Sequence, residues 1–173
     1  AKKAVPQTMP VATAIYQALL AEFNHDLPRW SADINPLSLT VNFRNPKISF
    51  AAGRSLLPSP YENILADFFP RYLQVLKKFA NSIETISIEG YTSSEWTSSD
   101  SIDSAYLNNM ALSHERTRAV LEYCLQLPTI APYKDWLRKT LTANGLSSSR
   151  VIIENGTEVP ESSRRVEFKI FIK

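Results

Sequence analysis

Successive segments of this chain show two different spacings of apolar residues. Alternating or short apolar segments predict strands, at 37–43, 83–91, 150–154 and 165–172. Apolar residues that recur every three or four positions predict helices, at 11–23, 61–79, 113–126 and 132–144. Helices placed between strands, followed by two closing strands, predict an α+β fold of two layers, in which helices pack on a sheet.

The segment before the first predicted strand has an apolar stripe of its own. Its members, four residues apart, are Val11, Ile15, Leu19 and Phe23. Pro36 closes a linker-like stretch after it. We therefore expect an N-terminal amphipathic helix and linker at 1–36 and the main domain at 37–173. Because soluble monomers avoid such an exposed stripe, it should fold back onto the domain rather than pair with a second copy.

The charge balance and hydropathy of the chain argue against two kinds of partner. The formal net charge is only +2, and no run of Lys or Arg exceeds two residues, so a nucleic acid is not expected. No apolar run approaches the roughly 20 residues that span a bilayer, and no signal peptide is seen. Because the chain begins at Ala1 without a Met, we interpret it as a mature form or an excised soluble fragment, with any membrane anchor upstream.

Arg116 stands where the periodicity requires an apolar residue. It follows Leu112 by four residues and precedes Val120 by four, so it shares the apolar face of the predicted helix. With Ser113 as the N-cap, Arg116 would also lie at the positive end of the helix dipole. The side chain and the N–H groups of the helix start therefore predict a receptor for a carboxylate or phosphate. The alternative is a structural salt bridge with an internal carboxylate.

Three segments around this helix carry a family pattern. They read Gly-Tyr-Thr-Ser at 90–93, Asn-Met-Ala-Leu-Ser-His-Glu-Arg-Thr-Arg-Ala-Val at 109–120 and Ser-Arg-Arg-Val-Glu at 163–167. The chain from about 37 to 173 thereby resembles the peptidoglycan-binding domain of OmpA-like outer-membrane proteins and MotB-like motor stators. The corresponding family motifs are Gly-His-Thr-Asp, Asn-x-x-Leu-Ser-x-x-Arg-Ala-x-x-Val and Asn-Arg-Arg-Val-Glu. The resemblance implies a two-layer βαβαβ mixed sheet with helices packed on one face.

The resemblance also implies a ligand and its contacts. Family members hold the diaminopimelate of cell-wall stem peptides, with the motif arginine on its carboxylate and the motif aspartate on its ammonium. Arg116 matches that arginine by its spacing from Leu112 and Ser113. The expected peptidoglycan-binding residues are Arg116, Thr92, Ser93, Asn109, Leu112, Ser113 and Arg164. For Thr92, Ser93 and Asn109, the alternative role is hydrogen bonding in a turn or a helix cap.

Ser93 stands where the family has its aspartate. A hydroxyl accepts a hydrogen bond from an ammonium but carries no charge, which weakens the contact. The loop from 93 to 108 is longer than the family's usual loop and contains the acids Glu95, Asp100 and Asp103. Any one of them would restore the missing carboxylate if it reached the site, and otherwise it is a solvated loop charge.

Two neighbouring arginines near the last strand cannot both face the ligand. Arg164 and Arg165 alternate across the strand, so one points to the cleft and the other pairs or is solvated. By resemblance we choose Arg164 as the contact. Tyr91 replaces the family histidine, and we expect it to pack under the loop rather than against the ligand.

No arrangement of nucleophile, base or metal ligands in the sequence predicts catalysis. Ser113, His114 and Cys124 fall on one helix, but Cys124 lies on a different face from His114. A nucleophile elbow, a phosphate-binding loop and metal-ligand spacing such as His-Glu-x-x-His are not found. We therefore expect a protein that is not an enzyme and uses no cofactor and no metal, with Cys124 as a buried structural residue.

These observations and the resemblance predict a periplasmic domain of a Gram-negative envelope protein. It would anchor that protein to the cell wall by gripping diaminopimelate-containing stem peptides, and would be held at the inner membrane if the whole is a proton-channel stator. Stator-type relatives act as dimers, so a homodimer is compatible with the full-length context. Two alternatives remain open. The fold would serve dimerisation or assembly in an envelope or secretion-associated complex with weak or lost wall binding, or the domain would hydrolyse the wall.

Overall fold

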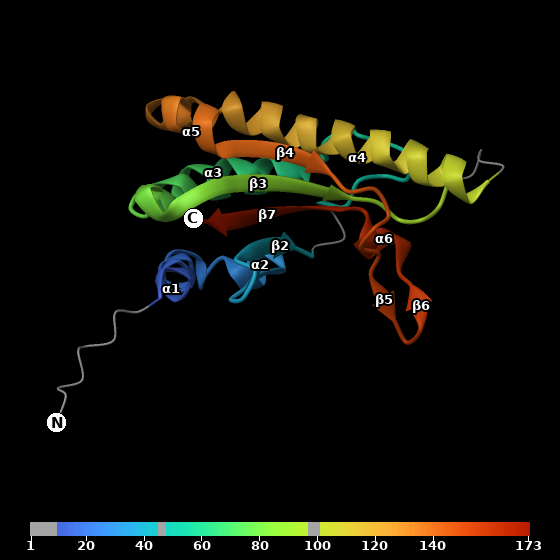
Figure 1. The fold of residues 1–173 in the computed structure, drawn as a ribbon, viewed down its shortest axis with the longest axis horizontal. Helices are drawn as coiled ribbons and strands as arrows, with labels where there is room; N and C mark the ends of the chain where they lie inside the picture. The colour runs from blue at the N-terminus through green and yellow to red at the C-terminus, as the bar shows by residue number, and fades with distance from the viewer. Residues whose placement is uncertain (1–9, 45–47, 97–100) are drawn as a thin grey trace.

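A five-stranded mixed sheet forms the centre of the computed structural model, which describes residues 10–44, 48–96 and 101–173 (Figure 1). In sheet order, the strands are β1 (Ala32–Asn35), β2 (Thr40–Phe43), β7 (Arg165–Ile172), β3 (Ile83–Tyr91) and β4 (Leu141–Gly145). Among these strands, β3 and β4 are parallel and the other neighbours are antiparallel. The last strand of the chain therefore lies inside the sheet, between β2 and β3.

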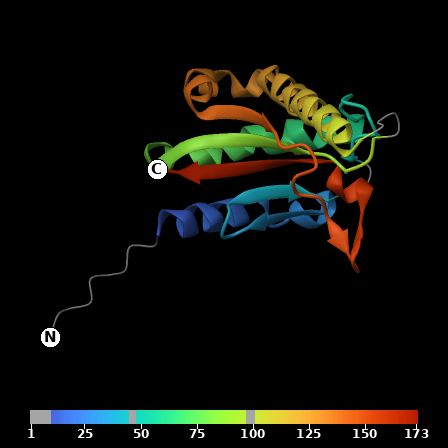
Figure 2. The same ribbon diagram turned by 45° about the vertical axis from the view of Figure 1, so that its right-hand side comes forward.

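A crossover joins the two parallel strands, and helices supply it. After β3 the chain passes through α4 (Ile102–Leu125), a 3₁₀ turn at Pro128–Tyr133 and α5 (Lys134–Thr140) before it enters β4. α4 packs against both β3 and β4. Figures 1 and 2 show α4 beside β4 at one edge of the sheet, whereas α1 (Val11–Phe23) lies toward the opposite edge.

The helices cover one face of the sheet with an aromatic core. Phe168, on β7, contacts the rings of Phe68 and Tyr72 on α3 (Ser59–Lys77), at centroid distances of 5.2 and 5.8 Å. Alternate residues of β7 are buried on that face, because side chains alternate along a strand. The predicted α+β fold, a mixed sheet with helices packed on one face, is confirmed.

The N-terminal helix belongs to the same core as the sheet. α1 has the predicted bounds, and Ile15, Leu19 and Phe23 are fully buried. The ring of Phe23 lies 5.2 Å from that of Phe68 on α3, so the apolar stripe folds back onto its own chain. The division expected at residue 36 falls in the turn between β1 and β2, and as a division of the sequence it stays a prediction.

The first hairpin begins earlier than the sequence pattern predicts. After α2 (Leu27–Trp30), β1 forms where a linker was expected. The next strand starts at Thr40 rather than at Leu37. Leu37 lies in the hairpin turn instead, where its side chain is 92% exposed. The side-chain oxygen of Asn35 accepts hydrogen bonds from the backbone N–H groups of Leu37 and Ser38, which fixes that turn.

The helix that carries Arg116 starts well before its predicted beginning. α4 begins at Ile102, and the side chain of Ser101 caps it by accepting from the backbone N–H of Ser104 at 3.0 Å. Ser113 is therefore an interior residue of the helix. The prediction that the N–H groups of a helix start surround Arg116 is wrong, whereas the apolar face deduced from spacing is indeed buried at Arg116.

A strand replaces the second half of the last predicted helix. α5 gives way to β4 at Leu141, whereas a helix was expected over 132–144 with Gly145 as its cap. A Cβ atom on Gly145 would lie 2.7 Å from the backbone nitrogen of His114 on α4, and Gly90 at the end of β3 is packed as tightly against the same helix. Both strand ends require glycine because α4 crosses them so closely.

A small hairpin precedes the last strand. β5 (Ile153–Glu154) and β6 (Thr157–Glu158) pair outside the main sheet, where one short strand at 150–154 was expected. α6 (Pro160–Ser163) follows and leads into β7, which has its predicted bounds. The hairpin and α6 lie at the end of the sheet where β3 finishes and β7 begins (Figure 1).

Candidate ligand-binding site

A pocket of about 180 Å³, which we call the Arg116 pocket, opens beside α4 at the end of β3. Most of the residues predicted to bind the ligand line it, although they come from distant parts of the chain. They are Thr92, Ser93, Asn109, Leu112, Arg116 and Arg164. Ala52, Gly53, Glu95 and Trp96 complete the wall. Ser113 is the predicted binding residue that the described lining does not include.

Backbone carbonyl groups hold the guanidinium of Arg116. The side chain is fully buried. Its Nε donates to the carbonyl oxygen of Arg54 at 2.8 Å, and its Nη2 donates to that of Ala51 at 3.0 Å. The guanidinium carbon lies 5.0 Å from the centroid of the Phe50 ring. Within the described residues the buried Nη1 has no hydrogen-bond partner, so the loop orients the group and leaves this nitrogen unpaired.

The positive charge of Arg116 is not balanced within the described part of the chain. The salt bridges found there include neither Arg116 nor Arg164. Burial, and then the nearby charge of Arg164, lower the pKa of Arg116 to about 10, so it stays protonated at neutral pH. The alternative of an internal salt bridge is therefore not observed among residues 10–44, 48–96 and 101–173. An anion in the pocket would relieve the repulsion between the two guanidinium groups.

Thr92 and Ser93 stand where β3 runs out into the loop. Both are buried, and the backbone N–H of Thr92 donates to the carbonyl oxygen of Ser147 at 2.9 Å. The Thr92 hydroxyl has no partner in the described ranges, so turn hydrogen bonding does not account for it. Asn109 does support the loop, since its Nδ2 donates to the carbonyl oxygen of Glu95 at 3.3 Å.

Ser113 makes structural hydrogen bonds, and its predicted role in binding stays a prediction. Its hydroxyl donates to the carbonyl oxygen of Met110 at 2.8 Å and accepts from the backbone N–H of Ser147 at 3.1 Å. These bonds tie the segment after β4 to α4. Ser113 lies outside the pocket because its side chain faces Gly145 at the end of β4.

One of the acids proposed to replace the missing carboxylate lies in the pocket. Glu95 is part of the lining. Asp103 is exposed in the first turn of α4, where it suits the helix dipole, and it does not line the pocket. Asp100 lies outside the described residues. Sequence reasoning missed Glu158 on β6, whose carboxylate accepts hydrogen bonds from the backbone N–H and the hydroxyl of Ser94 and so fixes the loop.

The two arginines near β7 have different surroundings. Arg164 lines the Arg116 pocket, and its Nε donates to the carbonyl oxygen of Phe50 at 3.1 Å. Arg165 pairs with Glu167 at 2.7 Å, and its guanidinium lies over the ring of Tyr91. Tyr91 itself is buried, and its hydroxyl donates to a carboxylate of the same strand. Arg164 is thus the arginine of this pair that a ligand in the pocket would meet.

The segment at 51–54 is the part of the site that sequence reasoning did not reveal. Its carbonyl groups contact Arg116 across separations of 62 and 65 residues, which no helix or strand spacing connects. Gly53, with φ of 68°, is a local signal for a turn, but a turn alone does not indicate what it faces.

Other kinds of site are not found in the ranges that the structure describes. No group of three or more His, Cys, Asp or Glu side chains there could hold a metal ion. None of the helices there is both long and apolar enough to cross a bilayer. Cys124 is fully buried, and burial raises the pKa of its thiol well above the ordinary value, which keeps it unreactive.

Comparison with known proteins identifies relatives of the whole described domain. No family model matches the chain. Zorya protein ZorB from Escherichia coli is 45% identical over 157 residues, which cover 90% of this chain and 67% of that protein. Among solved structures, a MotB-like protein from Desulfovibrio vulgaris is 20% identical, with a TM-score of 0.63 over 94% of this chain and 95% of that chain.

A second solved structure extends the structural likeness. The cell wall anchor of the T6SS from Pseudomonas aeruginosa is 19% identical, with a TM-score of 0.59 over 90% of this chain and 97% of that chain. At such identities the likeness shows a shared fold, and it confirms the resemblance to OmpA-like and MotB-like domains. Together with the ZorB alignment, it leads to one conclusion. This chain belongs to the ZorB family, and its domain has the fold of MotB-like and OmpA-like proteins.

Proposed function

We propose that this chain is a peptidoglycan-binding module that anchors a stator-type envelope protein to the cell wall, and that it is not an enzyme. Its membership of the ZorB family and its fold, shared with a MotB-like protein and a cell wall anchor, support the proposal. The observation that carries it is Arg116, a buried cation that forms no salt bridge within the described residues and lines a pocket. A wall peptide offers the carboxylate that such a cation requires.

The carboxylate of the ligand would bind at Arg116 and Thr92. Nη1 of Arg116 would donate one hydrogen bond, and the Thr92 hydroxyl, which lacks a partner in the described part of the chain, would donate another. Arg164 brings a second positive charge to the same wall. Because Nε and one N–H of Nη2 already donate to loop carbonyl groups, those carbonyl groups set the orientation of Arg116, and the ligand would use the remaining N–H groups.

Glu95 gives the same pocket a partner for a positive group. Diaminopimelate carries carboxylate and ammonium groups together, so it matches a lining that holds Arg116 and Glu95 at once. Ser93 adds a hydroxyl without charge at the position of the family aspartate. We therefore propose diaminopimelate-containing stem peptides as the ligand, with Glu95 in the role of the missing carboxylate.

The proposed place of the domain is the periplasm of a Gram-negative cell. The cell wall is reached from that compartment, and a stator-type protein would have its membrane-embedded part in the inner membrane. The proposed partners are thus the peptidoglycan on one side and a membrane anchor on the other. The similarity to MotB-like periplasmic domains supports this arrangement.

Co-sedimentation with purified sacculi tests the proposal. The protein should sediment with sacculi, and Arg116→Ala and Arg164→Ala should each reduce the bound fraction. Arg138→Ala is the control, because Arg138 is an exposed arginine on α5 that pairs with Asp135. Normal binding by both pocket variants, shown to be folded by circular dichroism, would refute the site. A wild-type protein that stays in the supernatant would refute wall binding, and release of soluble muropeptides would indicate a hydrolase.

A second candidate function is dimerisation or assembly with weak wall binding. Large apolar side chains at Ile102, Tyr106 and Leu107 are exposed on the first turns of α4, and soluble monomers tend to avoid such groups in clusters. The uncharged Ser93 also favours this alternative. Sedimentation velocity at two concentrations decides between the functions. A wild-type dimer that becomes a monomer in Leu107→Glu, in a protein that does not bind sacculi, would support assembly.

A further inference from the structure

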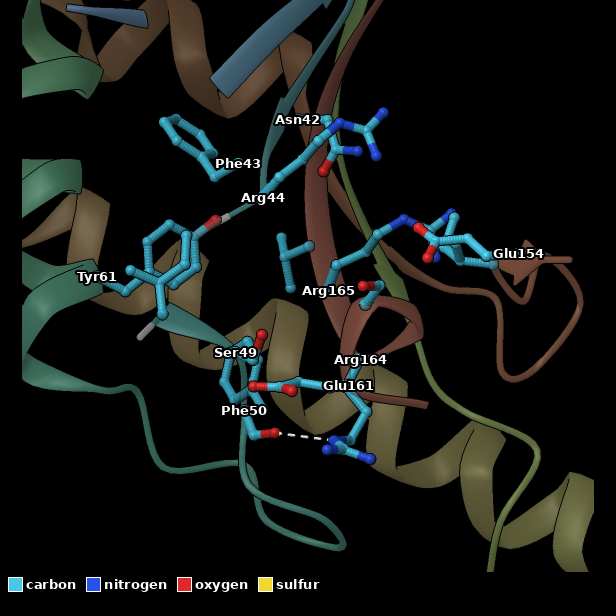
Figure 3. A pocket seen from close by; sticks show the side chains of 14 residues that line it. Asn42, Phe43, Arg44, Ser49, Phe50, Tyr61, Glu154, Glu161, Arg164 and Arg165 are labelled. Atoms are coloured by element: carbon cyan, nitrogen blue, oxygen red, sulfur yellow. Dashed lines mark hydrogen bonds between the residues drawn. The ribbon is translucent and has the colours of Figure 1, made fainter. Parts of the chain in front are cut away.

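β2 and β7 stop pairing before either strand ends. Their last pair is Asn42 with Glu167, although β2 continues to Phe43 and β7 begins at Arg165. A cavity of about 250 Å³ opens beyond that pair. Figure 3 shows it, with Asn42 and Arg44 from the β2 side at the top and Arg165 at the right. The cavity, which we call the strand gap, therefore has a strand edge on two of its sides.

Two buried polar groups in the lining of the strand gap lack hydrogen-bond partners within the described residues. They are the hydroxyl of Tyr61 on α3 and Oδ1 of Asn42. Tyr61 is 2% exposed and Asn42 is 5% exposed, so bulk water does not compensate them. A buried polar group without a partner costs roughly 1–3 kcal/mol, and native proteins contain few of them. A ligand that satisfied both groups would recover part of that free energy.

The remaining lining suits a small peptide better than a large ligand. The wall is mixed: Ile48, Phe50, Ile152 and Val166 contribute apolar surface, and charged groups come from Arg44, Glu154, Glu161, Arg164 and Arg165. The volume of about 250 Å³ is slightly below the roughly 300–1,000 Å³ of typical small-molecule pockets. The strand gap therefore has room for a short peptide segment that carries both apolar and charged groups, and not for a folded partner.

We propose that the strand gap is a second binding site, for a short extended peptide. A peptide carbonyl oxygen would accept a hydrogen bond from the Tyr61 hydroxyl, and a peptide N–H would donate one to Oδ1 of Asn42. The peptide backbone would lie between β2 and β7 in the manner of an added strand.

The strand gap and the Arg116 pocket share a boundary. Arg164 lines both. Phe50 connects them as well, because its ring lies under the guanidinium of Arg116 and its carbonyl oxygen accepts from Arg164. A ligand with its carboxylate at Arg116 would thus continue past Arg164 into the strand gap. The occupant is the adjoining part of the same wall stem peptide, an identification that rests on the proposed function.

Calorimetric titration with two probes tests this site. The first probe is free meso-diaminopimelate, which is long enough to fill the Arg116 pocket alone. The second is the stem peptide L-Ala-γ-D-Glu-meso-diaminopimelyl-D-Ala, which also supplies amide groups. Tyr61→Phe removes a single hydroxyl group and should weaken the stem peptide roughly threefold to tenfold, the net value of a neutral hydrogen bond. It should leave the affinity for free diaminopimelate unchanged.

Tyr72→Phe is the matched control. Tyr72 is also a buried residue of α3 whose hydroxyl has no partner in the described ranges, but it lines neither cavity. This variant should bind both probes like the wild type. Equal affinity of Tyr61→Phe and wild type for the stem peptide would overturn the second site and leave wall binding intact. A wild-type protein that binds neither probe would overturn the proposed function together with this inference.

Discussion

Two arginines inside this domain are held in opposite ways. Arg71, on α3, joins α1, α2 and its own helix through three carboxylates, at 2.6 to 3.0 Å, from Asp26, Glu22 and Asp67. Arg116, on α4, donates to two backbone carbonyl groups and to no carboxylate within the described residues. Each guanidinium lies over an aromatic ring, at 4.9 Å for Arg71 and 5.0 Å for Arg116. The two regions therefore differ in whether carboxylates contact the arginine, and both place an aromatic ring beside it.

The pKa values of these arginines move in opposite directions. Burial lowers the pKa of Arg71, but its hydrogen bonds to the three carboxylates raise it by more, so the net shift is upward. Burial and the charge of Arg164 lower the pKa of Arg116 to about 10. The fold thus neutralises Arg71 internally, whereas no carboxylate in the described part of the chain pairs with Arg116. Arg71 should matter for stability, and Arg116 for binding.

Replacing Arg116 by methionine should have the largest effect, and on binding. The change removes a charge-assisted hydrogen bond worth roughly 1.5–3 kcal/mol, so the affinity for the stem peptide should fall about tenfold to a hundredfold. Lysine should restore only part of it, because an ammonium lacks the planar fork that the loop carbonyl groups orient. Calorimetric titration measures both. Wild-type affinity in a folded Arg116→Met protein would show that Arg116 does not bind the ligand, and the contrast with Arg71 would fail.

Replacing Arg71 by methionine should act on stability instead. Removing one partner of a buried ion pair costs about 3–5 kcal/mol, and because the Arg71 side chain is 29% exposed we expect a smaller loss, of about 2 kcal/mol. Urea denaturation measures the free energy of unfolding, and sacculus binding should not change. Arg138→Met is the matched control, since its ion pair is exposed and should contribute little. A loss no larger than that of the control would show that the three carboxylates do not depend on Arg71.

Two changes of acid at the Arg116 pocket should have smaller effects. Ser93→Asp supplies the charge at the family position and should tighten diaminopimelate binding by about 1 kcal/mol, whereas Glu95→Gln should weaken it by a similar amount. The double variant should bind nearly as the wild type does. If Glu95→Gln binds normally, Glu95 is a solvated charge and the ammonium has another partner.

Low pH should reduce the free energy of unfolding, and protonation of Asp26 beside Arg71 should account for a modest part of that loss. Burial raises the pKa of Asp26, but hydrogen bonds from Arg71 and Arg29 lower it by more, so the folded pKa lies below the ordinary value of 3.8. A depressed pKa contributes stability above the unfolded pKa, and this is lost as the pH falls through the folded pKa. Urea midpoints should therefore decline below about pH 4, and Asp26→Asn should flatten that decline. An equally steep decline in this variant would assign it to other carboxyl groups.

The difference between these regions also explains what the sequence could reveal. The burial of Arg116 followed from its spacing to Leu112 and Val120, because helical periodicity is a local property. The carbonyl groups that hold it come from 51–54, and two of the acids around Arg71, Glu22 and Asp26, lie 49 and 45 residues from it in the chain. Such contacts depend on the packing of elements distant in sequence, which no local pattern encodes.

The two misplaced elements have separate physical reasons. The first half of α4 carries exposed apolar residues such as Ile102 and Leu107 rather than a buried stripe, so periodicity gave no sign of it. The residues of β4 were taken as helix, because their identity as a strand comes from parallel pairing with β3. Tertiary contacts override weak local preference in both segments. The strands β3 and β7, which have strong patterns and central positions, had their predicted bounds.

The direction of the strands has a mechanical consequence. α1 begins near one end of the sheet, and the Arg116 pocket lies at the other, where β3 ends (Figure 1). If the pocket held the wall, a load between it and α1 would act along the strand direction, in which β3 and β7 pair along nearly their whole length. Their hydrogen bonds would be sheared together instead of opening one after another. The domain would then resist tension most strongly along the line from the Arg116 pocket to α1. It would resist tension least across the sheet, from β1 to β4.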